Sequence, residues 1–185
     1  WIEAAAAVYA TTKEERLNRS MDRMISVIAQ AQESDGYIAS QNTVRNRPRF
    51  QRPNHHEVYV MGHLLTAAVV HHRCTGKSDF FNVAKKTGKF LYEQFKDKKP
   101  RMAHFPSNPS VVMGEVELYR ETGEPEYLEL AKTVVDMRGA FKGGSDQCQD
   151  RIPLRKETEV VGHAVFYTYL YSGAADVFME TGDPE

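Results

Sequence analysis

Two Gly-His pairs stand in the apolar stretches of this sequence, Gly62-His63 within residues 56–76 and Gly162-His163 within residues 150–176. A glycine inside a helix costs about 1 kcal/mol relative to alanine, so it indicates that another part of the chain approaches the backbone closely. A histidine on an apolar helix is either buried against a neighbour or directed at a ligand. We expect both pairs to lie inside helices and keep both roles open for the histidines.

His56 and Glu57 begin the first of these stretches. A zinc-protease helix needs a second histidine four residues after the first, and that position holds Val60, so the motif is excluded. His56 and His63 would lie about two turns apart on one helical face, near Tyr59. Their mixed donors and acceptors favour a polar, sugar-like binding surface over a metal site.

Other kinds of chemistry find little support in the residue types. No phosphate-binding loop, Ser-His-Asp set or cysteine nucleophile pattern is present, and Cys74 and Cys148 fit neither a disulfide framework nor a metal motif. The formal net charge of −1, with both signs interspersed, gives no electrostatic reason to expect nucleic acid. No apolar run approaches the ~20 residues of a membrane span. Glu157 and Glu159 precede the last helix, where a capping role is as consistent as a catalytic one.

The apolar periodicity predicts seven helices and no strand, so the chain is expected to be all-α. Thr-Gly steps at residues 75–76, 122–123 and 181–182 close similar units, a spacing typical of stacked helical hairpins. The connections 39–53, 96–107 and 140–154 are expected to be long loops. The predicted helices cover about residues 1–9, 13–32, 54–74, 78–95, 109–121, 125–139 and a last one through Gly162-His163 to 181.

The two ends of the chain suggest a larger protein. Trp1 opens directly into helical sequence without an initiator methionine, and Pro184 follows Thr181-Gly182 as Pro125 follows Thr122-Gly123 before a helix. We therefore expect a further helix beyond the chain. The last predicted helix should lack its partner and expose apolar surface.

Several blocks of the sequence together resemble glycoside hydrolase family 127, which includes β-L-arabinofuranosidases. The resemblance implies an (α/α)6 toroid, of which residues 1–185 would form the N-terminal portion of a single catalytic domain, truncated before the toroid closes, with the site in the central cavity. The blocks are WIEAAA, QESDGYI, NHHEVYVMGHLLTAAVVHHRCTG, VELYRETGEPEYLELAK and QDRIPLRKETEVVGHAVFYTYLYSGAAD.

The resemblance also implies which residues meet the sugar. His56 matches the histidine of an Asn-His-Glu-Leu-Tyr-like block, and His163 matches that of a Thr-Glu-Ala-Val-Gly-His block. Asn108 stands where the family has a histidine, and Phe166 stands where an arginine is common. With Glu159, the residues His56, Asn108 and His163 form the expected substrate-binding set. A change from histidine to asparagine keeps hydrogen bonding but removes a titratable group.

The family's catalytic groups are expected outside this chain. The resemblance implies a zinc-bound cysteine nucleophile and a glutamate acid/base, and neither Cys74 nor Cys148 matches the family's cysteines. The parent protein would be a retaining glycosidase acting on β-L-arabinofuranosides or a related plant-polysaccharide sugar. We expect no catalytic residue and no metal ligand among these residues, no activity from the chain alone, and two partners: a carbohydrate and the remainder of the domain.

Two alternatives remain open from the sequence. The hairpins could form an open solenoid that binds a partner on its concave face, or belong to another (α/α)6 sugar enzyme, such as an unsaturated glucuronyl hydrolase or an epimerase. Histidine, glutamate and aromatic residues gathered at one end of successive helices would favour the toroid. An apolar groove beside an outward polar face would favour the solenoid.

Overall fold

The computed structural model describes residues 1–184. Within that range every regular element is a helix, turns and loops connect the helices, and no β-strand occurs. The all-α prediction is confirmed, and the seven long helices are the seven predicted ones. The additional helix, α3, has only five residues, too few to show a periodic apolar pattern. The helices are α1 (Ile2–Thr12), α2 (Glu15–Ala31), α3 (Ser40–Val44), α4 (Glu57–Thr75), α5 (Asp79–Phe95), α6 (Ser110–Thr122), α7 (Pro125–Met137) and α8 (Ala164–Thr181).

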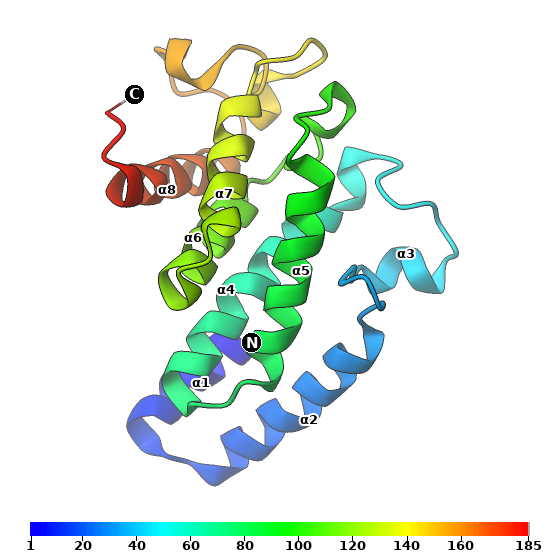
Figure 1. Cartoon of the computed structure of the whole chain (residues 1–185), viewed down its shortest axis with the longest axis vertical. Coiled ribbons are helices and arrows are strands. Elements are labelled where there is room, and N and C mark those ends of the chain that lie inside the picture. The colour runs from blue at the N-terminus through cyan, green and yellow to red at the C-terminus, as the bar shows by residue number, and fades with distance from the viewer. Residues whose placement is uncertain (185) are drawn as a thin grey trace.

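The long helices form two rows (Figure 1). In one row α1 packs against α4, α4 against α6, and α6 against α8; in the other, α2 packs against α5 and α5 against α7. Each hairpin joins one helix of each row, as in α4–α5 and α6–α7. The long connections therefore precede α4, α6 and α8, three helices that are neighbours in space.

The hairpin turns follow the Thr-Gly steps that the sequence repeats. Gly76 and Gly123 end α4 and α6 with φ angles of 74° and 71°, left-handed values that glycine adopts without strain. The preceding threonine donates its hydroxyl to the carbonyl four residues earlier, as Thr122 does to Leu118 at 2.8 Å. Pro125 is the first residue of α7, as expected from its position after the turn.

The two middle helices cross closely where the sequence places glycine. A Cβ on Gly62 of α4 would lie 2.5 Å from the backbone nitrogen of Val111, and one on Gly114 of α6 would lie 2.7 Å from the carbonyl oxygen of Gly62. The close approach predicted at Gly62 is confirmed. This crossing brings the beginnings of α4 and α6 together.

Two predicted helix starts are wrong. Helix α8 begins at Ala164, so Gly162 and His163 precede it, and α4 begins at Glu57, so His56 does not share its helical face with His63. Gly162 has a φ of 78° and His56 one of 58°, which a continuous right-handed helix cannot contain. A side-chain pattern does not reveal such a change in the backbone.

Helix α8 carries the exposed apolar side chains that were expected of the last helix. It packs against α6 and α7 on one side, through buried residues such as Leu170. Its outer side chains with more than a third of their surface exposed are Val165, Tyr171, Phe178 and Met179. Among the described residues no helix combines the length and the apolar character needed to cross a membrane.

Candidate functional site

His56 lies at the N-cap position of α4, exposed, in a left-handed conformation. Its ring meets the ring of Tyr59, one turn into the helix, edge to face with centroids 5.8 Å apart. The imidazole therefore stands over the first turn of α4 and keeps its ring nitrogens near solvent. From this position it can donate to or accept from a hydroxyl group of a ligand.

A row of rings continues from His56 across α4 to α8. Tyr59 and His63 lie 4.7 Å apart, and His63 and Tyr169 of α8 lie 5.4 Å apart, both pairs edge to face. Burial lowers the pKa of His63, so its ring is neutral at neutral pH. The region between α4 and α8 therefore carries aromatic faces from Tyr59 and Tyr169 and polar ring nitrogens from His63.

Asn108 is buried just before α6 and is linked to Tyr59 through Ser110. Its Oδ1 accepts the backbone N–H of Ser110 at 3.2 Å, and the hydroxyl of Ser110 donates to the carbonyl oxygen of Tyr59 at 3.1 Å. Its Nδ2 makes no hydrogen bond within residues 1–184 and is not among the fully buried unpaired atoms. The amide thus retains two donor hydrogens for another partner.

His163 caps α8 with its own side chain. Its Nδ1 accepts the backbone N–H of Val165 at 3.2 Å, and its ring stacks on Phe166 with centroids 4.4 Å apart and an angle of 23° between the planes. Phe166 and Tyr169 are three residues apart on α8 and are neighbours on its surface. Phe166 therefore lies about one turn before Tyr169, with His163 stacked on it at the start of α8.

The loop before α8 fixes the backbone of His163. The N–H of His163 donates to the carbonyl oxygen of Gln147 at 3.2 Å, and the buried side chain of Gln149 donates from Nε2 to the carbonyl oxygen of Val161 at 2.8 Å. A Cβ on Gly162 would lie 1.9 Å from the carbonyl oxygen of Asp146. Glycine is required here by the loop and not by a helix packed against it.

The ring of His56 contacts Tyr59, and Asn108 is linked through Ser110 to the backbone carbonyl of the same tyrosine. His163 contacts Phe166 at the start of α8 and makes no direct contact with His56 or Asn108 within residues 1–184. Glu159 stands apart. Its side chain is exposed, and no hydrogen bond or ion pair joins it to the rest of residues 1–184.

Sequence reasoning did not identify Tyr169 or Gln149. Tyr169 is one of several aromatic residues on α8, and only the packing selects it as the partner of His63. Gln149 lies in a polar loop whose fold the sequence does not indicate; its left-handed φ of 49° is the kind of feature that only coordinates reveal. No pattern in the sequence would have found either residue.

The two cysteines and the titratable groups do not form a metal centre. No group of three or more His, Cys, Asp or Glu side chains within the described range could hold a metal ion. Cys74 and Cys148 are both free, and burial raises the pKa of the Cys148 thiol, which disfavours the thiolate needed for ligation or attack. The zinc that the resemblance implies therefore does not fit the residues of this chain.

A cavity of about 470 Å³ has a lining that contains none of the residues of the ring row. It is lined by residues of α7, of α8 and of the connection between them, Asp136, Leu154 and Phe178 among them. None of the predicted sugar contacts lines it. His56, Asn108 and His163 instead lie at or just before the first residues of α4, α6 and α8.

Comparison with known proteins gives consistent matches over the whole chain. It is 32% identical to the non-reducing end β-L-arabinofuranosidase of Bifidobacterium longum subsp. longum, covering 99% of this chain and 32% of that protein. The structure superposes on a family 127 β-L-arabinofuranosidase from Geobacillus stearothermophilus with a TM-score of 0.90 at 28% identity, covering 99% of this chain and 32% of the other. A solved structure described as a glycoside hydrolase has a TM-score of 0.85 at 42% identity, covering 99% of this chain and 28% of the other.

The chain thus spans about a third of the length of these relatives. The family model described as the β-L-arabinofuranosidase, GH127 catalytic domain, matches residues 1–185, so the (α/α)6 relatives decide against the open solenoid. This chain belongs to the glycoside hydrolase family 127 catalytic-domain family.

Proposed function

We propose that this chain supplies part of the sugar-binding wall of a glycosidase that acts on β-L-arabinofuranosides or a related plant-polysaccharide sugar. The observation that carries the proposal is the position of His56, Asn108 and His163. They stand at the beginnings of the adjacent helices α4, α6 and α8, where His56 meets the ring of Tyr59, Asn108 is linked through Ser110 to the Tyr59 carbonyl, and His163 stacks on Phe166. Convergent polar groups beside aromatic faces suit a sugar, which presents hydroxyl groups and apolar C–H faces.

Each residue has a distinct part in the proposal. His163 accepts from the backbone at Nδ1, so its neutral ring presents an Nε2–H donor to a sugar oxygen. Asn108 offers its Nδ2 hydrogens, and the exposed His56 offers either a donor or an acceptor. Glu159 would approach the sugar from the exposed stretch before α8. These groups bind and orient the ligand, and none of them attacks it.

The catalytic groups of the retaining reaction are assigned to residues outside this chain. Such a reaction needs a nucleophile on one face of the sugar and a proton donor on the other. The residues here do not fit a zinc-bound cysteine, as shown by the separate, free Cys74 and Cys148. We therefore propose the rest of a catalytic domain as a partner. The exposed apolar residues of α8, Phe178 and Met179 among them, support that partner.

The proposal is tested by the affinity of the chain for L-arabinose, measured by calorimetry. His56→Ala, Asn108→Ala and His163→Ala should each weaken binding about tenfold, the equivalent of one hydrogen bond. His72→Gln is the matched control, because His72 stacks on Phe81 at the other end of α4. Unchanged affinity in all three variants would contradict the proposal.

A second assay separates binding from catalysis. The chain alone should release no p-nitrophenol from p-nitrophenyl β-L-arabinofuranoside, since it lacks the expected nucleophile. Release of p-nitrophenol in proportion to the amount of purified chain would mean that the nucleophile is among these residues, which would contradict that part of the proposal.

A further inference from the structure

Glu57 is a buried carboxyl group next to His56 and is not one of the expected sugar contacts. Only 3% of its surface is exposed. Its Oε1 accepts the hydroxyl of Tyr37 at 2.6 Å, and both carboxyl oxygens accept the backbone N–H of Phe50 at 3.0 Å. Since a buried polar group is costly to leave unpaired, these contacts hold two other segments of the chain, at Tyr37 and at Phe50, to the side chain of Glu57.

Phe50, seven residues before Glu57, is held through both its backbone and its ring. Its N–H is taken by Glu57, and its carbonyl oxygen accepts a hydrogen bond from Arg101 at 2.8 Å. Its ring stacks on Phe90 at 6.1 Å and meets Phe105 edge to face at 5.5 Å. Phe50 also has a left-handed φ of 50°, which a phenylalanine keeps only where its surroundings hold it.

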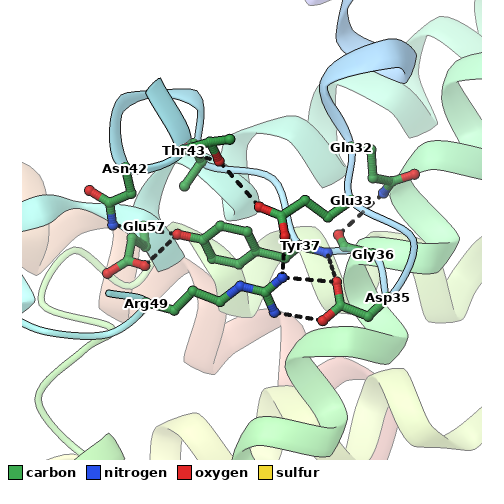
Figure 2. Close-up of polar contacts among 10 residues, drawn as sticks. Gln32, Glu33, Asp35, Gly36, Tyr37, Asn42, Thr43, Arg49 and Glu57 are labelled. Atoms are coloured by element: carbon green, nitrogen blue, oxygen red, sulfur yellow. Dashed lines mark hydrogen bonds and ion pairs between the residues drawn. The ribbon is translucent and has the colours of Figure 1, made fainter. Parts of the chain in front are cut away.

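Tyr37 is held between Glu57 and Arg49, as Figure 2 shows. The guanidinium of Arg49 lies 4.2 Å from the centroid of the Tyr37 ring and is paired with Asp35 at 2.6 Å and with Glu33 at 2.5 Å. Burial and the hydrogen bond to Glu57 raise the pKa of Tyr37 well above its usual value. The phenol therefore stays protonated and remains a donor to Glu57.

The contact between Glu57 and Phe50 closes a short loop that contains His56. Within residues 51–56 the chain makes one 3-10 turn, Pro53–His55, and the N–H of His56 donates to the carbonyl oxygen of Pro53 at 3.2 Å. His56 itself has a φ of 58°, an uncommon conformation for histidine that persists where the surroundings determine it.

We propose that Glu57 is a positioning residue for sugar binding. By tying Phe50 and Tyr37 to the first residue of α4, it fixes His56 in the left-handed conformation in which its ring meets Tyr59. The inference rests on the proposed role of His56 as a sugar contact. Glu57 itself touches no ligand in this account, because its two oxygens are occupied by Tyr37 and Phe50.

The test is an NMR measurement on the isotope-labelled chain with L-arabinose as the probe. In Glu57→Leu the nuclear Overhauser contact between the rings of His56 and Tyr59 should disappear, and the affinity for L-arabinose should fall about tenfold. Glu57→Gln keeps a carbonyl oxygen for the Phe50 N–H and should retain the contact. Glu115→Leu is the matched control, since it replaces another buried glutamate, one without a hydrogen-bond partner within residues 1–184.

A His56–Tyr59 contact that persists in folded Glu57→Leu would overturn the proposal. Should that variant not fold, hydrogen exchange in the unaltered chain decides: slow exchange of the Phe50 amide supports its contact with Glu57, and exchange at the rate of an exposed amide refutes it. If the unaltered chain does not bind L-arabinose, the proposed function fails. The ring contact still reports on Glu57 in that case.

Discussion

The Nδ1 atom of His163 accepts a hydrogen bond from the backbone N–H of Val165, 3.2 Å away, so the ring that we propose as a sugar contact also caps α8. Since the capping nitrogen is an acceptor, the neutral ring must carry its proton on Nε2. Helix α8 therefore determines which hydrogen-bonding group His163 presents outward.

Nitrogen-15 NMR should find neutral His163 in the Nε2–H form. His104 provides an internal control, because its Nδ1 lies 2.7 Å from the carboxylate of Asp150 and must donate to it. The Nε2 of His104 faces the carbonyl oxygen of Lys142 at 3.1 Å, so the two histidines are compared at Nδ1, where His104 should carry a proton and His163 none. A proton on Nδ1 of His163 would show that the capping bond is absent.

Replacing Gln149 should release His163 without unfolding the helices. Gln149→Leu removes the Nε2 hydrogen bond to the carbonyl of Val161 and leaves that carbonyl unpaired, at an expected cost of about 1–3 kcal/mol. The ring signals of His163 should shift, and L-arabinose affinity should fall.

The control for this change is Gln32→Leu. Gln32 also donates its amide to a backbone carbonyl, that of Val83 at 2.9 Å, but it lies at the end of α2. It should lose similar stability in urea while His163 and the affinity stay unchanged. If both variants shift the ring signals of His163 equally, Gln149 stabilises the fold in general and does not position His163.

Glu115 should make the fold less stable as pH rises. It is fully buried in α6 without a hydrogen-bond partner in residues 1–184, and burial raises its pKa well above the usual value. The folded state therefore keeps the proton that the unfolded chain loses above pH ~4.3. The stability associated with the protonated form is complete below that pH and is lost as pH rises toward the raised pKa.

Glu115→Leu should consequently be more stable than the unaltered chain at pH 8, by about 1–3 kcal/mol. Urea unfolding at pH 5 and pH 8 measures this, and the advantage should shrink at the lower pH. Glu115→Gln separates charge from polarity: it should reduce the pH dependence but gain less stability. A Glu115→Leu chain that is less stable at pH 8 would contradict the assignment.

The crossing of α4 and α6 should tolerate no side chain at Gly62. In Gly62→Ala the new Cβ would meet backbone atoms of Val111 at 2.5 Å and 2.7 Å, so the helices must move apart. Gly88→Ala is the matched control in α5, because its Cβ would meet side-chain atoms of Leu118 and Tyr127 at 2.8 Å, which can shift.

Both substitutions change helix propensity equally, so their difference reports the contact alone. Gly62→Ala should be the less stable of the two by about 1–3 kcal/mol in urea, and only it should weaken L-arabinose binding. Equal stability of the two variants would show that the α4–α6 crossing is not tight.

The sequence predicts the helices well because their signals are local. Apolar periodicity and the Thr-Gly endings at Gly76 and Gly123 predict the bounds of the long helices to within a few residues. Gly62 correctly predicts a close approach of another part of the chain. The same reasoning misplaces Gly162 inside a helix. Gly162 has a left-handed φ and packs against the carbonyl oxygen of Asp146. Glycine is needed there because of the folded loop, which the sequence pattern does not show.

The candidate site is only partly accessible from sequence. The resemblance identifies His56, Asn108 and His163, but their surroundings, such as the Ser110 hydrogen bond to the Tyr59 carbonyl, depend on which helices become neighbours. The supporting groups are less visible still. The side chains of Glu57 and Gln149 make hydrogen bonds to the backbone atoms of Phe50 and Val161. The sequence does not show that these backbone atoms lie beside them.

The central claim is that His56 and His163 face one sugar site, and the most direct test is a titration of the histidine-labelled chain with L-arabinose followed by NMR. Ring signals of both histidines should shift together with a single dissociation constant, while those of His72, stacked on Phe81, stay unmoved. Shifts of only one of the two rings, or shifts of each with its own constant, would contradict a shared site.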